Sequence, residues 1–199
     1  MIIGKDFLPR GSGIVTRRPI IIQLFHTQPN SKDYYQFAHR PKEAFMDEKS
    51  ARAELEKEMV NGAGNNKGIS SAPVVIKVFS PDVINLSLID LPGITKIPVG
   101  DQPSDIESRI IEMIKLYIQN PNTLILAISP GNYDIANSDA LKLAKEIDPQ
   151  GQRTLGIVTK LDLIEDERSM LGLMDGTVHP LELGYIGLRC RNQKELEQG

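Results

Sequence analysis

Asp90-Leu-Pro-Gly93 and Thr159-Lys160-Leu161-Asp162 are the two stretches that decide the fold of this chain. Each closes a run that predicts a buried strand. The first has the DxxG form of a loop that senses a γ-phosphate, and the second has the TKxD form that selects guanine. Together they indicate a guanine-nucleotide switch, although the sequence contains no G-x-x-x-x-G-K-[ST] phosphate loop.

Composition bounds the class of protein. The chain has 199 residues, of which 40% are hydrophobic and 25% charged, as is usual for one globular α/β domain. Its net charge of −3 gives no basic field for nucleic acid, so we expect no nucleic-acid partner. The single cysteine, Cys190, excludes an internal disulfide, and the first residues have no signal-peptide pattern. These features favour a cytoplasmic location.

Hydrophobic periodicity predicts the order of the elements. Residues 26–42 are polar and proline-punctuated, which indicates a surface loop, and the strands at 74–79 and 84–89 are expected to form a hairpin-like pair. From residue 84 on, strands alternate with helices, so we expect a mainly parallel sheet covered on both faces. The expected strands are 19–25, 74–79, 84–89, 124–128, 154–159 and 185–188, and the expected helices are 43–60, 104–118, 138–147 and 165–175.

The motif residues follow the predicted strands directly. Asp90, Ser129, Thr159 and the residues after Leu188 all stand at carboxyl ends of strands. In an open parallel sheet these ends share one rim, where ligands bind. We therefore expect the side chains to converge there.

Asp162 has the chemistry needed to recognise guanine. The guanine edge offers two donors, N1–H and the N2 amino group, and one carboxylate can accept both. Adenine presents a different pattern, and leaving the carboxylate unsatisfied penalises it by about 2 kcal/mol or more. The Lys160 stem can lie along the base. An isolated TKxD is equally typical of a strand end with a solvated lysine and a helix-capping aspartate.

Asp90 and Gly93 have the chemistry needed at a phosphate. A strand-end aspartate can hold Mg²⁺ through water, and a glycine brings the backbone close to a γ-phosphate or an attacking water. Alone, the motif is more typical of a Pro-Gly turn. Its separation from TKLD favours nucleotide binding.

A glycine-rich segment, Arg10-Gly-Ser-Gly-Ile-Val-Thr16, precedes the first strand. Thr16 could place its hydroxyl on Mg²⁺ and its carbonyl toward a water. Arg17 and Arg18 could form a phosphate patch, but adjacent arginines are more typical of a solvated surface.

Four stretches, in order, resemble the GTPase domain of the dynamin superfamily over 5–196, most specifically over 90–163. GDQP and TKLDL are closer to conventional dynamins and dynamin-related proteins, whereas Cys190-Arg191 is similar to the Mx branch. The four stretches are RGSGIVTRRP from Arg10, DLPGITKIPVGDQP from Asp90, NSDALKLAKEIDPQGQRT from Asn137 and TKLDL from Thr159.

The resemblance implies an α/β fold of the P-loop NTPase type, Ras-like, with a mostly parallel sheet between helices in three layers. Residues 1–199 would be a partial G domain, from switch I to the final base-side loop, without the stalk and membrane-binding regions. Family members carry a first strand and phosphate loop before the segment that begins here at Gly4. Without that interior strand we expect two unpaired sheet edges, and weak GTP binding or none by this chain alone.

The resemblance also implies residue roles in a Mg²⁺-dependent hydrolysis of GTP to GDP and phosphate. Thr16 and Gly93 would orient the water, and Thr16 and Asp90 would serve the Mg²⁺. Asp134, Lys96 and Asp101 would stabilise a homodimer of G domains. The nucleotide-binding positions would be Asp90, Leu91, Pro92, Thr159, Lys160, Leu161, Asp162, Glu165, Cys190, Arg191, Asn192 and Gln193. Glu165 and Cys190 depart from the family's usual aspartate and asparagine.

The intact family acts in the cytoplasm at membranes or organelles, where polymers drive fission, and microtubules are a further partner by resemblance. An alternative is a non-catalytic fragment that pairs with intact dynamin-like GTPases. A different Rossmann-like module is disfavoured, because no G-x-G-x-x-G follows a strand.

Overall fold

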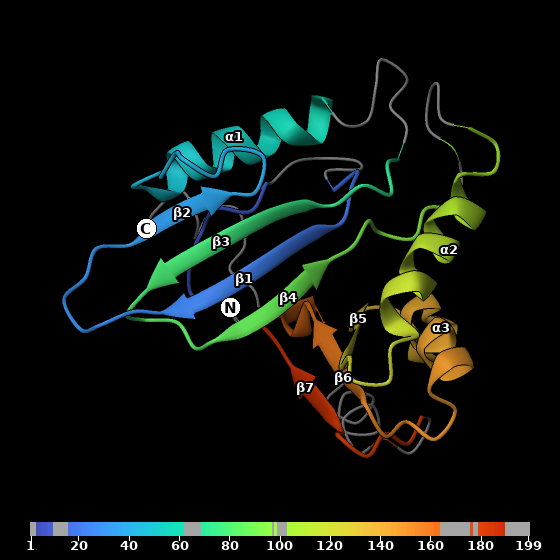
Figure 1. The fold of residues 1–199 in the computed structure, drawn as a ribbon. Coiled ribbons are helices and arrows are strands. Elements are labelled where there is room, and N and C mark those ends of the chain that lie inside the picture. The colour runs from blue at the N-terminus through green and yellow to red at the C-terminus, as the bar shows by residue number, and fades with distance from the viewer. Residues whose placement is uncertain are drawn as a thin grey trace. The chain divides into compact units, whose positions relative to one another are not determined.

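The computed structural model describes residues 3–9, 16–61, 69–96, 98, 103–163, 176 and 179–189. The chain divides into two compact units, Met1–Met113 and Ile114–Gly199, called unit 1 and unit 2 below. Their boundary falls inside the helix α2 (Ile106–Ile118). Figure 1 shows the elements of both units.

Unit 1 is built on a four-stranded mixed sheet with the order β2-β3-β1-β4. The strands are β1 (Ile20–His26), β2 (Tyr34–Phe37), β3 (Val74–Ser80) and β4 (Leu86–Asp90). β1 runs parallel to β3 and antiparallel to β4, and β2 runs antiparallel to β3.

Two expectations about this sheet are wrong. The strands near 74–79 and 84–89 do not pair as a hairpin, because β1 lies between them and bonds to both. Residues 26–42 are not only loop, since they contain β2. In both cases pairing across a long sequence separation decides the outcome, and local turn signals do not report it.

Helix α1 (Glu48–Asn61) covers one face of this sheet, as Figure 1 shows. Alternate residues of each strand point to the same face, so β1 and β3 both present aliphatic side chains to the helix. Ala51, Leu55 and Met59 of α1 join them in one buried cluster. The strand residues of this cluster include Ile20, Ile22, Leu24, Tyr35, Phe37, Val74, Ile76 and Val78.

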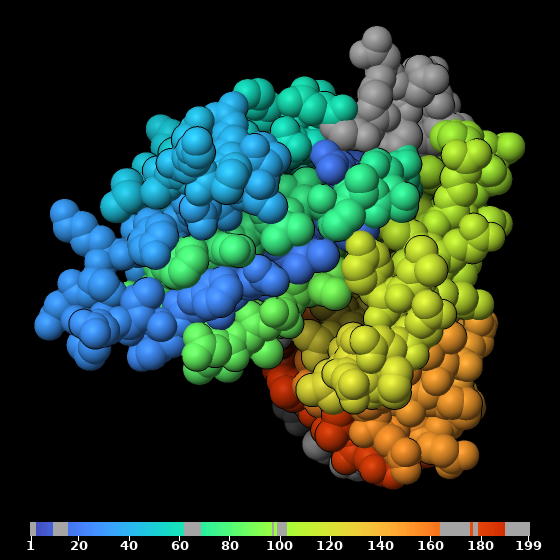
Figure 2. Space-filling model, in the orientation of Figure 1, coloured from blue at the N-terminus to red at the C-terminus, as the bar shows by residue number. Residues whose placement is uncertain are grey.

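The opposite face of the sheet carries a ladder of three aromatic rings. Tyr34 stacks on Phe79 with ring centroids 4.4 Å apart, and Phe79 stacks on Phe25 at 4.9 Å. Phe25 remains 37% exposed. Figure 2 shows atoms of β1, β3 and β4 at the surface of unit 1 in this view.

Unit 2 contains a three-stranded parallel sheet with the order β5-β6-β7. Its strands are β5 (Ile125–Pro130), β6 (Thr154–Thr159) and β7 (Tyr185–Gly187). Helix α3 (Asp139–Ile147) connects β5 to β6, begins at the N-cap Ser138 and buries Leu141, Leu143 and Ala144. The predicted parallel arrangement is confirmed for this part of the chain.

The fold is therefore mixed α/β, with two hydrogen-bonded sheets and three α-helices in the described residues. The expectation of a mainly parallel sheet holds for the sheet of unit 2 and not for that of unit 1. The helix expected over 165–175 lies outside the described residues. Among the helices that are described, none has the length and apolar character needed to cross a membrane.

Candidate functional site

In unit 1, Thr16 and Asp90 lie in contact. The Thr16 hydroxyl donates to Oδ2 of Asp90 at 3.1 Å. The sheet explains this contact, because Asp90 ends β4 opposite Ile20, near the start of β1. Burial raises the pKa of Asp90 above its ordinary value, and the hydrogen bond from Thr16 opposes that shift. The two oxygen groups that the resemblance assigns to Mg²⁺ thus lie beside each other in unit 1.

The loop after β4 presents Gly93 at the surface. Leu91 is partly buried and Pro92 is buried, whereas Gly93 is exposed and has open space where a side chain would extend. The Thr95 hydroxyl donates to the Gly93 carbonyl at 3.3 Å. A backbone without a side chain can approach a ligand closely at this position.

The donor set at Thr16 and Asp90 fits a magnesium ion. Mg²⁺ prefers hard oxygen ligands and binds proteins through one or two carboxylates, water and substrate phosphates. A hydroxyl and a partly buried carboxylate 3.1 Å apart offer that chemistry. Thr16 and Asp90 are therefore the residues that could hold the ion.

In unit 2, the carboxyl ends of the three parallel strands meet at one edge. Pro130 of β5 is in register with Thr159 of β6, and the Gly131 amide donates to the Thr159 carbonyl at 2.7 Å. The Leu188 amide, directly after β7, donates to the Val158 carbonyl at 2.7 Å. The expected convergence is therefore present for Ser129, Thr159 and the segment after Leu188 within unit 2. It does not hold for Asp90 in this sheet, because Asp90 ends a strand of the unit 1 sheet.

The TKLD segment leaves this edge through an unusual backbone conformation. Lys160 has φ of 56°, in the left-handed region that non-glycine residues rarely adopt. The chain then forms the 3₁₀ turn η2 (Leu161–Leu163), in which the Leu163 amide donates to the Lys160 carbonyl at 3.0 Å. Lys160 and Asp162 are both exposed. The turn thus leaves the Asp162 carboxylate open to solvent.

Asp134 lies in the connection between β5 and α3. Its carboxylate accepts from the Ala136 amide at 3.0 Å and so caps the 3₁₀ turn η1 (Ile135–Asn137). Asp134 is exposed, and its neighbour Tyr133 is 70% exposed. This surface position suits a contact with another molecule.

The remaining predicted site residues are distributed as follows. Lys96 is described and exposed. Thr16, Asp90, Leu91, Pro92, Gly93 and Lys96 belong to unit 1, and Asp134, Thr159, Lys160, Leu161 and Asp162 belong to unit 2. Outside the described residues lie Asp101, Glu165, Cys190, Arg191, Asn192 and Gln193.

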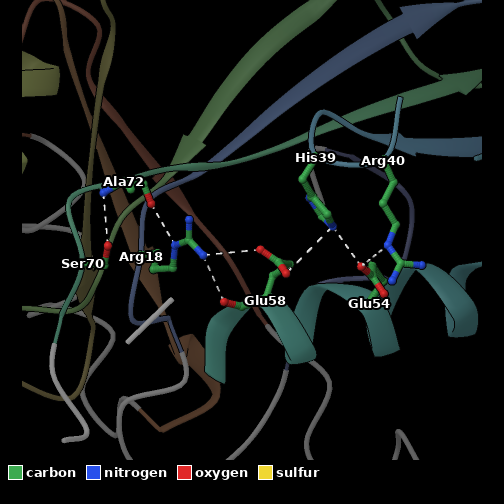
Figure 3. Close-up of polar contacts among 7 residues, drawn as sticks. All are labelled: Arg18, His39, Arg40, Glu54, Glu58, Ser70 and Ala72. Carbon is green, nitrogen blue, oxygen red and sulfur yellow. Dashed lines mark hydrogen bonds and ion pairs between the residues drawn. The ribbon is translucent and has the colours of Figure 1, made fainter. Parts of the chain in front are cut away.

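Arg18 is a residue whose environment the sequence pattern misjudged. Adjacent arginines suggested a solvated surface, but the Arg18 side chain is only 12% exposed. It bonds to the backbone near Ala72 and to Glu58 of α1, as Figure 3 shows. Two adjacent arginines give no sign of this burial in the sequence, because the segments that bury Arg18 lie 40 and 54 residues away along the chain.

Comparison with known proteins identifies the family. The sequence model of the Dynamin family matches residues 1–161. Dynamin-A of Dictyostelium discoideum is 49% identical over 98% of this chain, and Dynamin-2 of Bos taurus is 52% identical over 98%. Dynamin-1 of Homo sapiens is 50% identical over 98% of the chain. The chain spans 22% to 23% of the length of these relatives.

The family match covers most of the chain, including Thr16, Asp90, Gly93 and Lys160. The relatives match beyond it, so that nearly the whole chain aligns at about half identity. Both comparisons agree with the motifs, and the chain belongs to the dynamin family.

Proposed function

We propose that this chain is part of a dynamin-type G domain that binds and hydrolyses GTP. The observation that carries the proposal is the family match over residues 1–161, which hold Thr16, the DLPG loop and the first three residues of TKLD. The domain assignment to 1–199, from switch I to the final base-side loop, is part of the same proposal. Kinship with much longer proteins, of which the chain covers 22% to 23%, supports a role in the fission or remodelling of membranes. It also supports a cytoplasmic location beside those membranes.

Base recognition is assigned to the TKLD segment. The exposed Asp162 carboxylate accepts from N1–H and the N2 amino group of guanine, and the exposed Lys160 lies along the base plane. The loop of Arg191, Asn192 and Gln193, with Cys190 and Glu165, completes the base pocket by resemblance. Adenine lacks the matching donors, so selectivity arises from hydrogen-bond polarity.

Water and phosphate handling is assigned to Thr16 and the DLPG loop. Mg²⁺, when bound with GTP, neutralises the charge that develops on the phosphate oxygens. The Thr16 hydroxyl and the Asp90 carboxylate serve that ion, and the Thr16 carbonyl and the Gly93 backbone orient the attacking water. The Thr16–Asp90 hydrogen bond at 3.1 Å supports this assignment, because it holds both oxygens in one place.

The dimer residues are assigned by kinship. Asp134 would reach across to a second G domain, while Lys96 and Asp101 would steady the active site of their own chain. The exposure of Asp134 and Tyr133 supports a contact surface just before η1. Microtubule binding rests on kinship alone.

Phosphate release with GTP and Mg²⁺ tests the enzymatic proposal. A G domain that joins these residues to the family's first strand and phosphate loop should release phosphate from GTP and not from ATP. In that protein Thr16→Ala should lower the rate by about 10²-fold, since it removes a group that positions the water. The matched control is Thr27→Ala, which removes a hydroxyl bonded to Ser31 in a turn. Equal rates for Thr16→Ala and wild type would contradict the role of Thr16.

A second candidate function is non-catalytic pairing with intact dynamin-like GTPases. The exposed Asp134 and Tyr133 favour it, because such a surface needs no phosphate loop. A pull-down with an intact relative should recover the wild-type chain and much less of Asp134→Ala. Equal recovery of both proteins would count against this function, and GTP-dependent phosphate release by the chain would make it unnecessary.

A further inference from the structure

The Arg18 guanidinium joins three segments of unit 1. Its Nε donates to the Ala72 carbonyl at 2.8 Å, and its Nη1 donates to the Glu58 carbonyl at 3.2 Å. Nη1 also lies 3.5 Å from the Glu58 carboxylate. The segment that enters β1, the last turn of α1 and the segment that leads into β3 therefore meet at one side chain, as Figure 3 shows.

Two backbone hydrogen bonds join the segment that enters β1 to the segment that leads into β3, one on each side of Arg18. The Ser70 amide donates to the Arg17 carbonyl at 3.0 Å, and the Val74 amide donates to the Pro19 carbonyl at 2.8 Å. These bonds extend the β1–β3 pairing toward residue 17. The side chain of Arg18 adds a charged anchor to α1 that the backbone bonds do not provide.

Glu58 is itself held in a wider ion-pair network on α1. Nε2 of His39 lies 4.0 Å from the Glu58 carboxylate and 2.9 Å from that of Glu54. Nε of Arg40 lies 3.1 Å from the Glu54 carboxylate, which is 8% exposed. The His39 hydrogen bond and the Arg40 charge keep the pKa of Glu54 below its ordinary value despite burial.

A histidine with two glutamates also has the donor types of a metal site, and their ligand atoms lie within 4.8 Å of one another. Arg18 and Arg40 already neutralise both carboxylates. A divalent cation between them would face two guanidinium groups, so the cluster is an ion-pair network.

We propose that Arg18 is the positioning residue of Thr16, and that its bonds to Glu58 and Ala72 hold the Thr16 hydroxyl against Asp90. Two peptide units separate the residues, and consecutive Cα atoms are about 3.8 Å apart, so movement of Arg18 displaces Thr16 directly. The consequence for catalysis rests on the proposed function, but the positioning itself does not.

The geometry requires arginine at this position. The planar guanidinium directs Nε to one acceptor and Nη1 to two others at fixed angles, which the single ammonium of lysine cannot reproduce. Arg18→Lys therefore keeps the charge but loses the two separately directed donors of the guanidinium. A role in positioning predicts that Arg18→Lys behaves like Arg18→Gln, whereas a role of charge alone predicts that lysine restores wild-type behaviour.

Nuclear magnetic resonance of the full chain without nucleotide tests the proposal. The threonine methyl groups report the environment of Thr16, and amide hydrogen exchange reports the Ser70 amide that bonds to Arg17. The variants are Arg18→Gln, Arg18→Lys and Glu58→Gln. The matched control is Arg40→Gln, which removes a guanidinium from the other end of the same network without touching the Thr16 segment.

Arg18→Gln and Arg18→Lys should both shift the Thr16 methyl resonance and raise exchange at the Ser70 amide about tenfold or more. Glu58→Gln should do so less, because it retains the backbone acceptor of Glu58. Arg40→Gln should leave Thr16 unchanged. In all variants amides within β3, such as Val78, should keep wild-type protection.

An unchanged Thr16 methyl resonance in folded Arg18→Gln or Arg18→Lys would overturn the proposal, and so would an equal change in Arg40→Gln. If Arg18→Gln does not fold, Glu58→Gln is the deciding variant. An unshifted Thr16 methyl resonance in Glu58→Gln would then overturn the proposal. Failure of the proposed function is distinguishable, because it shows as absent phosphate release with the Thr16 response intact.

Discussion

Gly156 determines how closely β6 and β7 can approach at one residue pair. A Cβ atom built on Gly156 would lie 2.2 Å from Cδ1 of Tyr185, which real atoms cannot tolerate. The Tyr185 ring cannot withdraw easily, since its hydroxyl donates to the His179 carbonyl at 2.7 Å. The glycine is therefore required by the ring that stands over it.

Gly156→Ala should lower the free energy of unfolding by about 1–3 kcal/mol, because a buried clash forces a side chain or strand to shift. Thermal or urea unfolding measures the change. Adding Tyr185→Ala should relieve part of the clash. The loss of unfolding free energy in the double variant should therefore be smaller than the sum of the losses in the two single variants. Additive effects would show that the two residues do not interact.

At the scale of elements, Asp148 joins the end of α3 to the start of β6. Its carboxylate accepts from the Gln152 amide at 3.1 Å, the Arg153 amide at 3.0 Å and the Thr154 hydroxyl at 2.7 Å. Burial alone would raise the pKa of Asp148, but these hydrogen bonds, with that from Thr154 foremost, lower it below its ordinary value. The ionised form therefore stabilises the folded unit.

Asp148→Asn should reduce stability at pH 7 by about 1–3 kcal/mol, since an amide oxygen replaces a charged acceptor. A carboxyl whose folded pKa is depressed stabilises the protein above its unfolded pKa of about 3.9 and loses that effect as pH falls through the folded value. Urea unfolding between pH 7 and pH 3 should therefore show the two proteins converging at low pH. A constant difference over that range would contradict the expectation.

Strand β4 forms one edge of the unit 1 sheet. In the described part of the chain only β1 pairs with it. Its residues Leu86-Ser-Leu-Ile89 carry no charge, and Leu86 and Ile89 are 36% and 38% exposed. Natural proteins commonly protect such edges with lysine or proline, so this edge favours pairing between copies.

Ser87→Lys should reduce concentration-dependent self-association, because it places a charge in the middle of that edge. Sedimentation velocity over a range of concentrations measures the effect. The control is Ser71→Lys, an exposed serine outside the strands. Equal association of both variants would show that copies do not meet at β4.

The sequence predicted some elements better than others. The difference follows from how far apart along the sequence the pairing residues lie. β6 was predicted at its observed bounds, and α3 within one residue, because an apolar run and a serine cap define them locally. β2 was missed, since its four residues stand within a polar, proline-punctuated stretch and its ladder forms with β3, about 40 positions away. The placement of β1 between β3 and β4 was missed for the same reason.

The candidate site shows the same limit. The resemblance assigned Thr16 and Asp90 to one Mg²⁺, and the two side chains lie in contact. The left-handed backbone at Lys160 and the burial of Arg18 could not, because neither a lysine nor an arginine pair signals them. Both depend on neighbours that only the folded chain supplies.

At the scale of the whole molecule, the chain belongs to the dynamin family and is described as two units, each with its own sheet. Unit 1 carries the oxygen pair assigned to Mg²⁺ and water, and unit 2 carries the segment assigned to guanine. The guanine assignment is the central claim, because it separates a guanine-nucleotide protein from any other α/β nucleotide binder.

Titration of the ¹⁵N-labelled protein with GMP tests that claim most directly, since base recognition by Asp162 needs no phosphate cradle. Up to millimolar GMP should shift the Lys160, Asp162 and Leu163 amides, and AMP should not. Xanthine replaces the N2 donor of guanine with an acceptor, so Asp162→Asn should lose the response to GMP and gain one to XMP. Equal responses to GMP and AMP, or an unchanged preference in Asp162→Asn, would contradict the account.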